Sequence, residues 1–183
     1  KNDSILDSMI TVINQHDFLA VLVGGSYISD HRFEIRVEKI KKKINKPLIL
    51  FPGSSEQVSK HADAILFTSL LSGRNIKYLI EEQVKSSLYI KKNGIEVIPT
   101  GYLLIGNHSD SAVKRTSETD PLSLSNKDNI LAHALVAEYF GMKCVYLEGG
   151  SGVSSSLPPS LVQFISSNIS IPLIVGGGIR TSE

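Results

Sequence analysis

The sequence predicts a parallel α/β fold, and three observations lead to this prediction. Short apolar segments recur along the 183 residues, helical patterns separate them, and the apolar segments end in glycine, serine or proline. Such alternation is typical of a parallel sheet whose strands are joined by right-handed crossovers. The composition, 42% hydrophobic and 20% charged, is that of an ordinary globular protein, and we expect one domain over residues 1–183.

Six apolar segments are predicted to be strands. They cover residues 19–23, 47–51, 64–68, 96–105, 143–147 and 172–175. Continuous apolar runs of this length are typical of strands that are buried on both faces. Helical patterns lie between them, at residues 4–15, about 30–44, 75–92, 125–140 and 158–166. In the helix over residues 75–92, the spacing predicts an inward face made of Ile76, Leu79, Ile80, Val84 and Leu88.

The positions of the glycines distinguish a doubly wound sheet from a closed barrel. A dinucleotide-binding sheet concentrates glycine in its first strand-to-helix turn, whereas barrels build phosphate sites after their late strands. Here glycines follow several strands and are densest at residues 149–152 and 176–178, and neither these nor residues 24–25 form the dinucleotide fingerprint. The sequence therefore predicts a TIM (β/α)8 barrel. Since such a barrel needs about 250 residues, about six of its eight strands are expected here.

Charge and cysteine content exclude several classes of protein. The formal net charge of +1 creates no overall field that would collect nucleic acid. The lysines at residues 39–46 have no interleaved aromatic residues, so we interpret them as a solvated helix face rather than a nucleic-acid site. The single cysteine, Cys144, excludes a disulfide framework and a cysteine-based zinc cluster and fits a cytoplasmic location. No apolar run reaches the roughly 18 residues of a membrane span, so we expect a soluble protein that can work beside a membrane.

The candidate site begins where a predicted strand ends on Glu148 and continues directly into glycines. Glycine lets main-chain N–H groups approach a ligand closely, and an oxyanion is the natural ligand for such groups. A second loop of the same kind follows the last predicted strand. We expect the two loops to hold one phosphate through Gly150, Ser151, Gly152, Gly177 and Gly178. The alternative is that these glycines only make tight turns.

Glu148 is the candidate general base. It is the carboxylate of this chain that is flanked by both a strand and a glycine loop, at the strand end where α/β folds place their chemistry. The alternative is a structural Glu148 that accepts hydrogen bonds from the loop amides. Tyr102 and the neighbouring apolar residues are candidates for the lining of a lipid groove, although ordinary barrel core is an equal alternative for the aliphatic ones.

Four motifs carry a resemblance to a known family. They are Val-Gly-Gly-Ser at residues 23–26, Glu-Val-Ile-Pro-Thr-Gly-Tyr-Leu-Leu-Ile at 96–105, Tyr-Leu-Glu-Gly-Gly-Ser-Gly at 146–152 and Val-Gly-Gly-Gly-Ile-Arg at 175–180. With these motifs in this order, the chain resembles the geranylgeranylglyceryl phosphate synthases, which include the bacterial heptaprenylglyceryl phosphate synthases. The resemblance implies a prenyltransferase on a TIM barrel. Such an enzyme joins the C3 hydroxyl of sn-glycerol 1-phosphate to a polyprenyl diphosphate and releases pyrophosphate with Mg²⁺.

The resemblance also implies site residues and partners. The glycerol phosphate site falls on Tyr146, Leu147, Glu148, Gly149, Gly150, Ser151, Gly152, Gly177 and Gly178, and the metal-adjacent serine falls on Ser26. The family's first-strand aspartate and lysine have no counterpart before Ser4, and its last-strand Gly-Asn would follow Glu183, so we expect the first and last strands to be missing. Family members form dimers or larger assemblies, which implies a homo-oligomer.

Two other functions are compatible with the same glycine loops. A phosphosugar isomerase would use them with an acid and a base at two strand ends, without a prenyl groove. A catalytically silent phosphate-binding barrel would use them for binding alone. The length of the prenyl chain depends on the depth of a groove and is not predicted by the sequence.

Overall fold

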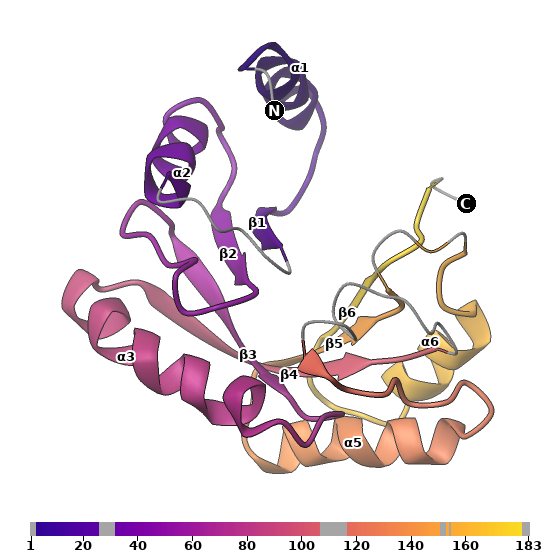
Figure 1. The fold of residues 1–183 in the computed structure, drawn as a ribbon. Helices are drawn as coiled ribbons and strands as arrows, with labels where there is room; N and C mark the ends of the chain where they lie inside the picture. Colours follow the sequence, from indigo (N-terminus) through magenta and orange to yellow (C-terminus); the bar gives the residue numbers. More distant parts are fainter. Residues whose placement is uncertain (1–2, 26–31, 107–116, 151–152, 154, 181–183) are drawn as a thin grey trace. The chain divides into compact units, whose positions relative to one another are not determined.

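The structure, a computed structural model, describes residues 3–25, 32–106, 117–150, 153 and 155–180. Within these residues helices separate most of the strands, and β3 follows β2 through turns alone (Figure 1). The strands are β1 (Val21–Gly25), β2 (Leu48–Pro52), β3 (Ala64–Leu70), β4 (Glu96–Leu104), β5 (Cys144–Glu148) and β6 (Leu173–Gly176). The helices are α1 (Asp3–Gln15), α2 (Phe33–Lys41), the π-helical turn η1 (Lys77–Glu81), α3 (Glu82–Asn93), α5 (Lys127–Tyr139) and α6 (Pro159–Ser166). This order confirms the predicted α/β fold.

The strands of the described residues follow the order β1-β2-β3-β4-β5-β6, and the neighbours β1 and β2, β2 and β3, β4 and β5, and β5 and β6 pair in parallel. Sequential order with a helix between successive strands is the arrangement of a (β/α)8 barrel, whereas a doubly wound sheet reverses direction at a switch point. The structure therefore shows six strands of the TIM (β/α)8 barrel class, as predicted.

The chain divides into two compact units, and each is described by itself. The first comprises Lys1–Phe67 and Val84–Val97, and the second comprises Thr68–Gln83 and Ile98–Glu183. The single domain over residues 1–183 stays a prediction. The candidate site lies in the second unit.

The core of the second unit forms between the strands β4 and β5 and the helices α5 and α6, which cover one face of them (Figure 1). Leu103, Val145 and Leu147 lie in this core and are fully buried. Ile130 on α5 and Ile165 on α6 are equally buried and complete it. Apolar burial of this kind is the main stabilising term in folding and fixes which face of β5 points away from the helices.

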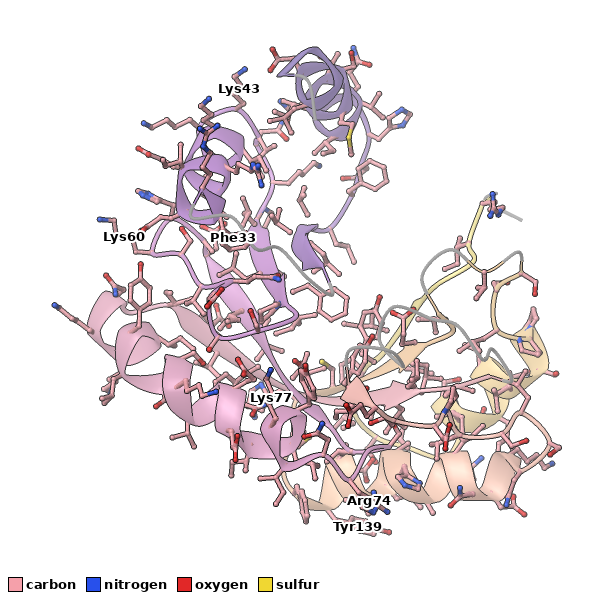
Figure 2. All side chains as sticks on the ribbon, viewed as in Figure 1. Phe33, Lys43, Lys60, Arg74, Lys77 and Tyr139 are labelled. Carbon is pink, nitrogen blue, oxygen red and sulfur yellow. The ribbon has the colours of Figure 1, made fainter. Side chains whose placement is uncertain are left out.

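The core of the first unit joins α1 and α2 to the first strands, around Phe33, Val37, Leu48 and Leu50. The lysines of α2 form ion pairs on the surface: Lys41 with Asp63 at 2.6 Å, Lys42 with Glu38 at 2.6 Å, and Lys43 with Asp7. Figure 2 shows Lys43 and Lys60 projecting outward from this unit. Exposed pairs of this kind contribute little to stability, so the apolar core holds this unit together.

The predicted inward face of the third helical segment is wrong for four of its five residues. Ile76, Ile80, Val84 and Leu88 are 57–82% exposed. The buried residues of α3 are instead Ser86 and Ile90, and Leu79 packs against the core of the second unit. Polar residues also lie on the inner side of this segment; the Gln83 side-chain amide, for example, donates to the carbonyls of Thr68 and Tyr78. Apolar residues occur on both sides of this helical segment. The helical spacing of apolar residues therefore does not identify which side faces the core.

No helix in the described part of the chain combines the length and the apolar character that crossing a bilayer requires. Apolar side chains are exposed at the carboxyl end of α5, as some are on the surface of most globular proteins. Tyr139 is 75% exposed and projects from the side of α5 that faces away from β4 and β5 (Figure 2).

Replacing Ile130 with alanine should lower the free energy of unfolding by about 2–5 kcal/mol, because a fully buried side chain leaves a cavity in the core. Urea unfolding followed by circular dichroism measures this change. Leu88→Ala is the matched control, since Leu88 is 82% exposed and its loss should change stability by about 0.5 kcal/mol or less. Equal losses in the two variants would contradict the assignment of the core.

Candidate active site

The candidate site is built on the face of β5 that points away from the helices. Successive side chains of a strand point to opposite faces, so the burial of Val145 and Leu147 in the helix-facing core sends Tyr146 and Glu148 to the other face. Tyr102 of β4 is the parallel register partner of Tyr146 and lies beside it. The two rings stack with centroids 5.4 Å apart and planes inclined by 24°. The strand period therefore brings two tyrosines and one carboxylate together.

Glu148 lies at the last position of β5 and is only 4% exposed. Its Oε1 accepts a hydrogen bond of 2.7 Å from the N–H of Gly150, and the Tyr102 hydroxyl donates a second hydrogen bond to the carboxylate. The Glu148 carbonyl accepts from the Ile105 N–H at 2.9 Å, which fixes the main chain at the strand end. A buried carboxylate with two donors is held in one place, as an acid or base in a site must be.

The glycine loops after β5 and β6 lie against each other. Glu148 pairs in register with Gly176, and the Gly149 N–H donates to the Gly176 carbonyl at 2.8 Å. A Cβ on Gly177 would lie 2.7 Å from the Gly150 nitrogen and 2.9 Å from the Glu148 Oε1, closer than any real Cβ contact. Gly177 also has φ +88°, a left-handed conformation that favours glycine. Glycine is therefore required at this position for the two loops and the carboxylate to meet.

Burial raises the pKa of the Glu148 carboxyl, while the hydrogen bonds from Gly150 and Tyr102 lower it in part. The net direction is upward from the ordinary value of 4.5, because burial outweighs the two donors. A raised pKa makes this carboxylate a stronger base than a solvated one.

The same surroundings keep both tyrosines neutral. Burial, the charge of Glu148 and the nearby Tyr146 raise the pKa of Tyr102 well above its usual value. Burial and the charge of Glu148 raise the pKa of Tyr146 to about 12. Both phenols are therefore protonated at neutral pH, and the Tyr102 hydroxyl is a hydrogen-bond donor.

The structure brings together most of the predicted site residues that it describes. Tyr102, Tyr146, Glu148, Gly150 and Gly177 meet at the carboxyl ends of β4, β5 and β6. Gly149 bonds to β6 through its N–H, and Gly178 follows in the second loop with φ +70°.

Leu147 differs from the other predicted site residues, because its side chain lies in the core against the helices and only its main chain can face the site. Ser26, Ser151 and Gly152 lie outside the described residues.

Sequence reasoning missed the hydrogen bond between Tyr102 and Glu148. The hydroxyl of Tyr102 bonds to the carboxylate and the residue is 8% exposed, while its place in the lining of a lipid groove stays a prediction. The strand period supplies part of the signal, because it places Tyr146 and Glu148 on one face of β5, but the register between β4 and β5 is not visible in either segment alone. Tyr102 lies two residues before the end of β4, in register with Tyr146, and Tyr146 shares a face with Glu148.

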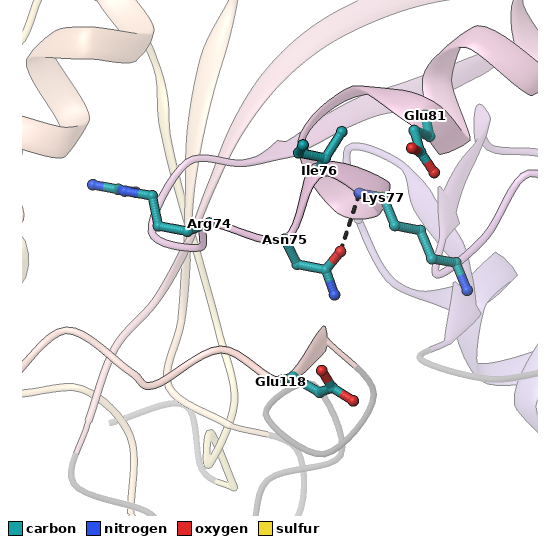
Figure 3. Close-up of a pocket in the computed structure, with 6 residues that line it drawn as sticks. All are labelled: Arg74, Asn75, Ile76, Lys77, Glu81 and Glu118. Atoms are coloured by element: carbon teal, nitrogen blue, oxygen red, sulfur yellow. Dashed lines mark hydrogen bonds between the residues drawn. The ribbon is translucent and has the colours of Figure 1, made fainter.

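A separate surface cleft of about 560 Å³ also lies in the second unit (Figure 3). It is lined by Arg74, Asn75, Ile76, Lys77, Glu81 and Glu118. Arg74 and Lys77 point away from each other in Figure 3, and the Arg74 guanidinium donates to the carbonyls of Leu71 and Gly73. Because its charged groups diverge and have mixed signs, this cleft shows no convergent set of groups for chemistry, unlike the surroundings of Glu148.

The described residues do not by themselves make a magnesium site. They contain no cluster of three or more histidine, cysteine, aspartate or glutamate side chains arranged to hold a metal. Glu148 is a hard oxygen ligand of the kind that Mg²⁺ prefers, but its carboxylate already accepts from Gly150 and Tyr102.

The fold and the site define the class of protein. It is a TIM-barrel protein whose candidate site lies at the carboxyl ends of the strands, the edge where barrel enzymes place their active sites. The PcrB family profile matches residues 2–183, and the chain belongs to this family.

Relatives with known names agree with this assignment. The geranylgeranylglyceryl phosphate synthase of Flavobacterium johnsoniae is 46% identical over 174 residues, which are 95% of this chain and 72% of that protein. The enzyme of the same name from Methanopyrus kandleri is 43% identical over 164 residues, 90% of this chain and 68% of that protein. The resemblance to geranylgeranylglyceryl phosphate synthases is thus confirmed, and the chain is an enzyme of this prenyltransferase type.

Solved structures give the same result for the fold. The geranylgeranylglyceryl phosphate synthase of Thermoplasma acidophilum, in complex with its substrate sn-glycerol-1-phosphate, matches with a TM-score of 0.91 and 34% identity, over 99% of this chain and 73% of that one. The wild-type enzyme of Thermoplasma volcanium matches with a TM-score of 0.83 and 38% identity, over 93% of this chain and 68% of that one. The TIM-barrel prediction is therefore confirmed.

Glu148→Gln should change how stability depends on pH. Because the folded protein raises the pKa of Glu148 above 4.5, this carboxyl stabilises the fold most below pH 4.5, and that contribution is lost as the pH rises through the raised pKa. Glutamine imitates the neutral acid at every pH. The free energy of unfolding of the wild type, minus that of Glu148→Gln, should therefore fall as the pH rises above 4.5. Urea titrations at several pH values measure it, and a difference that rises with pH would contradict the burial of this charge.

Proposed function

We propose that this chain catalyses the transfer of a polyprenyl group from its diphosphate to the C3 hydroxyl of sn-glycerol 1-phosphate. The observation that carries the proposal is the buried Glu148 carboxylate at the junction of two glycine loops, in a chain of the PcrB family. Family membership favours this reaction over the phosphosugar isomerase and the silent barrel. The structural relative from Thermoplasma acidophilum, whose substrate is sn-glycerol-1-phosphate, supports the choice of acceptor.

In the proposed reaction, the Glu148 carboxylate accepts the proton of the C3 hydroxyl. The hydroxyl oxygen forms a bond to C1 of the prenyl chain, and the bond between C1 and the diphosphate oxygen breaks. The bonding electrons leave with the pyrophosphate. Burial raises the pKa of Glu148, which suits a base that must take a proton from an alcohol.

The loops around Glu148 provide main-chain donors for the phosphate of the acceptor. Gly150, Gly177 and Gly178 all have positive φ, at 104°, 88° and 70°. Consecutive N–H groups in such conformations form concave nests that bind anions. Ser151 and Gly152, which the sequence also assigns to this phosphate, follow Gly150 directly in the sequence. An anion here would lie beside Glu148, which accepts from Gly150 at 2.7 Å.

Mg²⁺ is proposed as the cofactor, held mainly by the diphosphate. Mg²⁺ is usually bound through one or two carboxylates together with substrate phosphates, so the lack of a ligand cluster among the described residues is compatible with this form of binding. When bound, it supplies positive charge that neutralises the leaving diphosphate. Ser26 is the residue that the sequence assigns to its neighbourhood.

The cytoplasmic location, homo-oligomeric state and peripheral position at a membrane surface are further proposals. The free, buried thiol of Cys144 supports a reducing compartment. A polyprenyl diphosphate carries a lipid chain, which supports work close to a membrane. Light scattering of the purified protein measures the oligomeric state, and flotation with vesicles measures membrane association.

Replacing Glu148 with glutamine should reduce kcat for prenyl transfer by roughly 10²–10⁴-fold, because the general base is lost. The assay uses sn-glycerol 1-phosphate, Mg²⁺ and radiolabelled prenyl diphosphates of several lengths, with extraction of lipid-soluble product. Affinity for sn-glycerol 1-phosphate, measured by calorimetry, should persist because main-chain groups hold the phosphate. Asp128→Asn, which removes an exposed carboxylate of α5, is the control. Full turnover in Glu148→Gln would remove this residue from the mechanism.

Chelation of divalent metals with EDTA should abolish product formation but leave the binding of sn-glycerol 1-phosphate unchanged. The reason is that the leaving diphosphate needs the metal, whereas the glycerol phosphate is held by N–H groups. Calorimetry and the radiolabel assay, each run with EDTA and again after excess Mg²⁺ is added, measure the two effects. Product formed at the full rate in EDTA would rule out the magnesium requirement.

A further inference from the structure

Tyr102 contacts the proposed base directly. Its hydroxyl donates a hydrogen bond to the Glu148 carboxylate, while its ring stacks on Tyr146 at 5.4 Å. The main chain on either side is fixed, since the Tyr102 carbonyl accepts from the Leu71 N–H at 3.0 Å and the Leu104 N–H donates to the Ser72 hydroxyl at 2.9 Å. These contacts hold the Tyr102 hydroxyl in one position. A hydroxyl held in this way can fix the position of the Glu148 carboxylate to which it donates.

The second donor on Glu148 has a different character. The Gly150 N–H belongs to the loop that the proposed function assigns to the phosphate, and it now bonds to Oε1 of Glu148 at 2.7 Å. One N–H cannot fully serve both acceptors. When the Gly150 N–H bonds to a phosphate instead, Glu148 loses that hydrogen bond. The hydrogen bond from the Tyr102 hydroxyl then remains on the carboxylate.

We propose that Tyr102 is a positioning residue for the reaction: its hydroxyl holds the Glu148 carboxylate in place while the loop N–H of Gly150 turns to the substrate phosphate. This inference rests on the proposed function and deepens it. It gives the Tyr102 hydroxyl a polar role, while the place of the ring in a lipid groove stays a prediction.

The groups that face Glu148 in the described residues are few. Tyr102 approaches from β4 and Tyr146 from β5, and both are neutral at neutral pH because burial raises the pKa of each. From the second loop, Gly177 presents main chain alone. The Tyr146 hydroxyl lies against Gly176, where a Cβ would overlap it, so this hydroxyl is directed at β6. Tyr102 is therefore the phenol whose removal should change the titration of Glu148.

Tyr102→Phe tests the inference because it removes the hydroxyl and keeps the ring that stacks on Tyr146. Its hydrogen bond lowers the pKa of Glu148, so its loss should move the titration midpoint of this carboxyl to higher pH. The probe is NMR of protein labelled at the glutamate side-chain carboxyl carbon, with the Glu148 signal assigned by its absence in Glu148→Gln. Tyr146→Phe is the matched control and should shift the midpoint less than Tyr102→Phe does.

The activity profile gives the second readout. In Tyr102→Phe, the acid limb of kcat/KM against pH should move to higher pH, with a loss of roughly tenfold or more on that limb. The affinity for sn-glycerol 1-phosphate and the thermal unfolding midpoint should change little. A role limited to packing would leave the acid limb where it is in the wild type.

The outcomes separate the inference from the proposed function. A wild-type protein that binds sn-glycerol 1-phosphate but forms no prenylated product overturns the proposed function, and the role of Tyr102 in that reaction with it. An active wild type, with a Glu148 midpoint that is unchanged or lowered in Tyr102→Phe, overturns the positioning role alone. An upward shift of both the NMR midpoint and the acid limb supports it.

Discussion

The alternation of side chains along β5 is the constraint on which the rest of the site depends. Val145 and Leu147 must face the helices, since their burial forms the core of the second unit, and Tyr146 and Glu148 are therefore directed to the opposite face. A shift of one residue would bury the carboxylate among apolar helix side chains without donors, at a large cost in free energy. Core packing and the position of the candidate base are thus fixed by the same five-residue strand.

Burial of Glu148 is tolerated because main-chain groups surround it. The Gly150 N–H satisfies one oxygen, and the absence of side chains at Gly176 and Gly177 lets the second loop approach both Tyr146 and the carboxylate. The same glycine positions that allow this approach also present N–H groups in conformations suited to an anion. The raised pKa of Glu148 and the glycine conformations proposed to bind an anion therefore have one common structural cause, the close meeting of β5 and β6 at their carboxyl ends.

Much of this organisation was predictable from the sequence, because it follows from local chemistry. Apolar runs that end in glycine marked the strands, and a carboxylate between a strand and a glycine loop marked Glu148. The failures came from long-range packing. In the segment of η1 and α3, Ile76, Ile80, Val84 and Leu88 satisfied the helical spacing but lie outward, since tertiary contacts bury Ser86 and Ile90 instead. The bond between Tyr102 and Glu148 depends on strand register, which periodicity within one segment does not specify.

The most direct measurement is a crystal structure of the protein soaked with sn-glycerol 1-phosphate. Our account predicts the phosphate on the main-chain N–H groups of Gly177 and Gly178, with the Gly150 N–H turned toward it. The C3 hydroxyl should then lie about 3 Å from the Glu148 carboxylate. A phosphate bound elsewhere, or a C3 hydroxyl directed away from Glu148 toward solvent, would contradict the assignment of this carboxylate as the base.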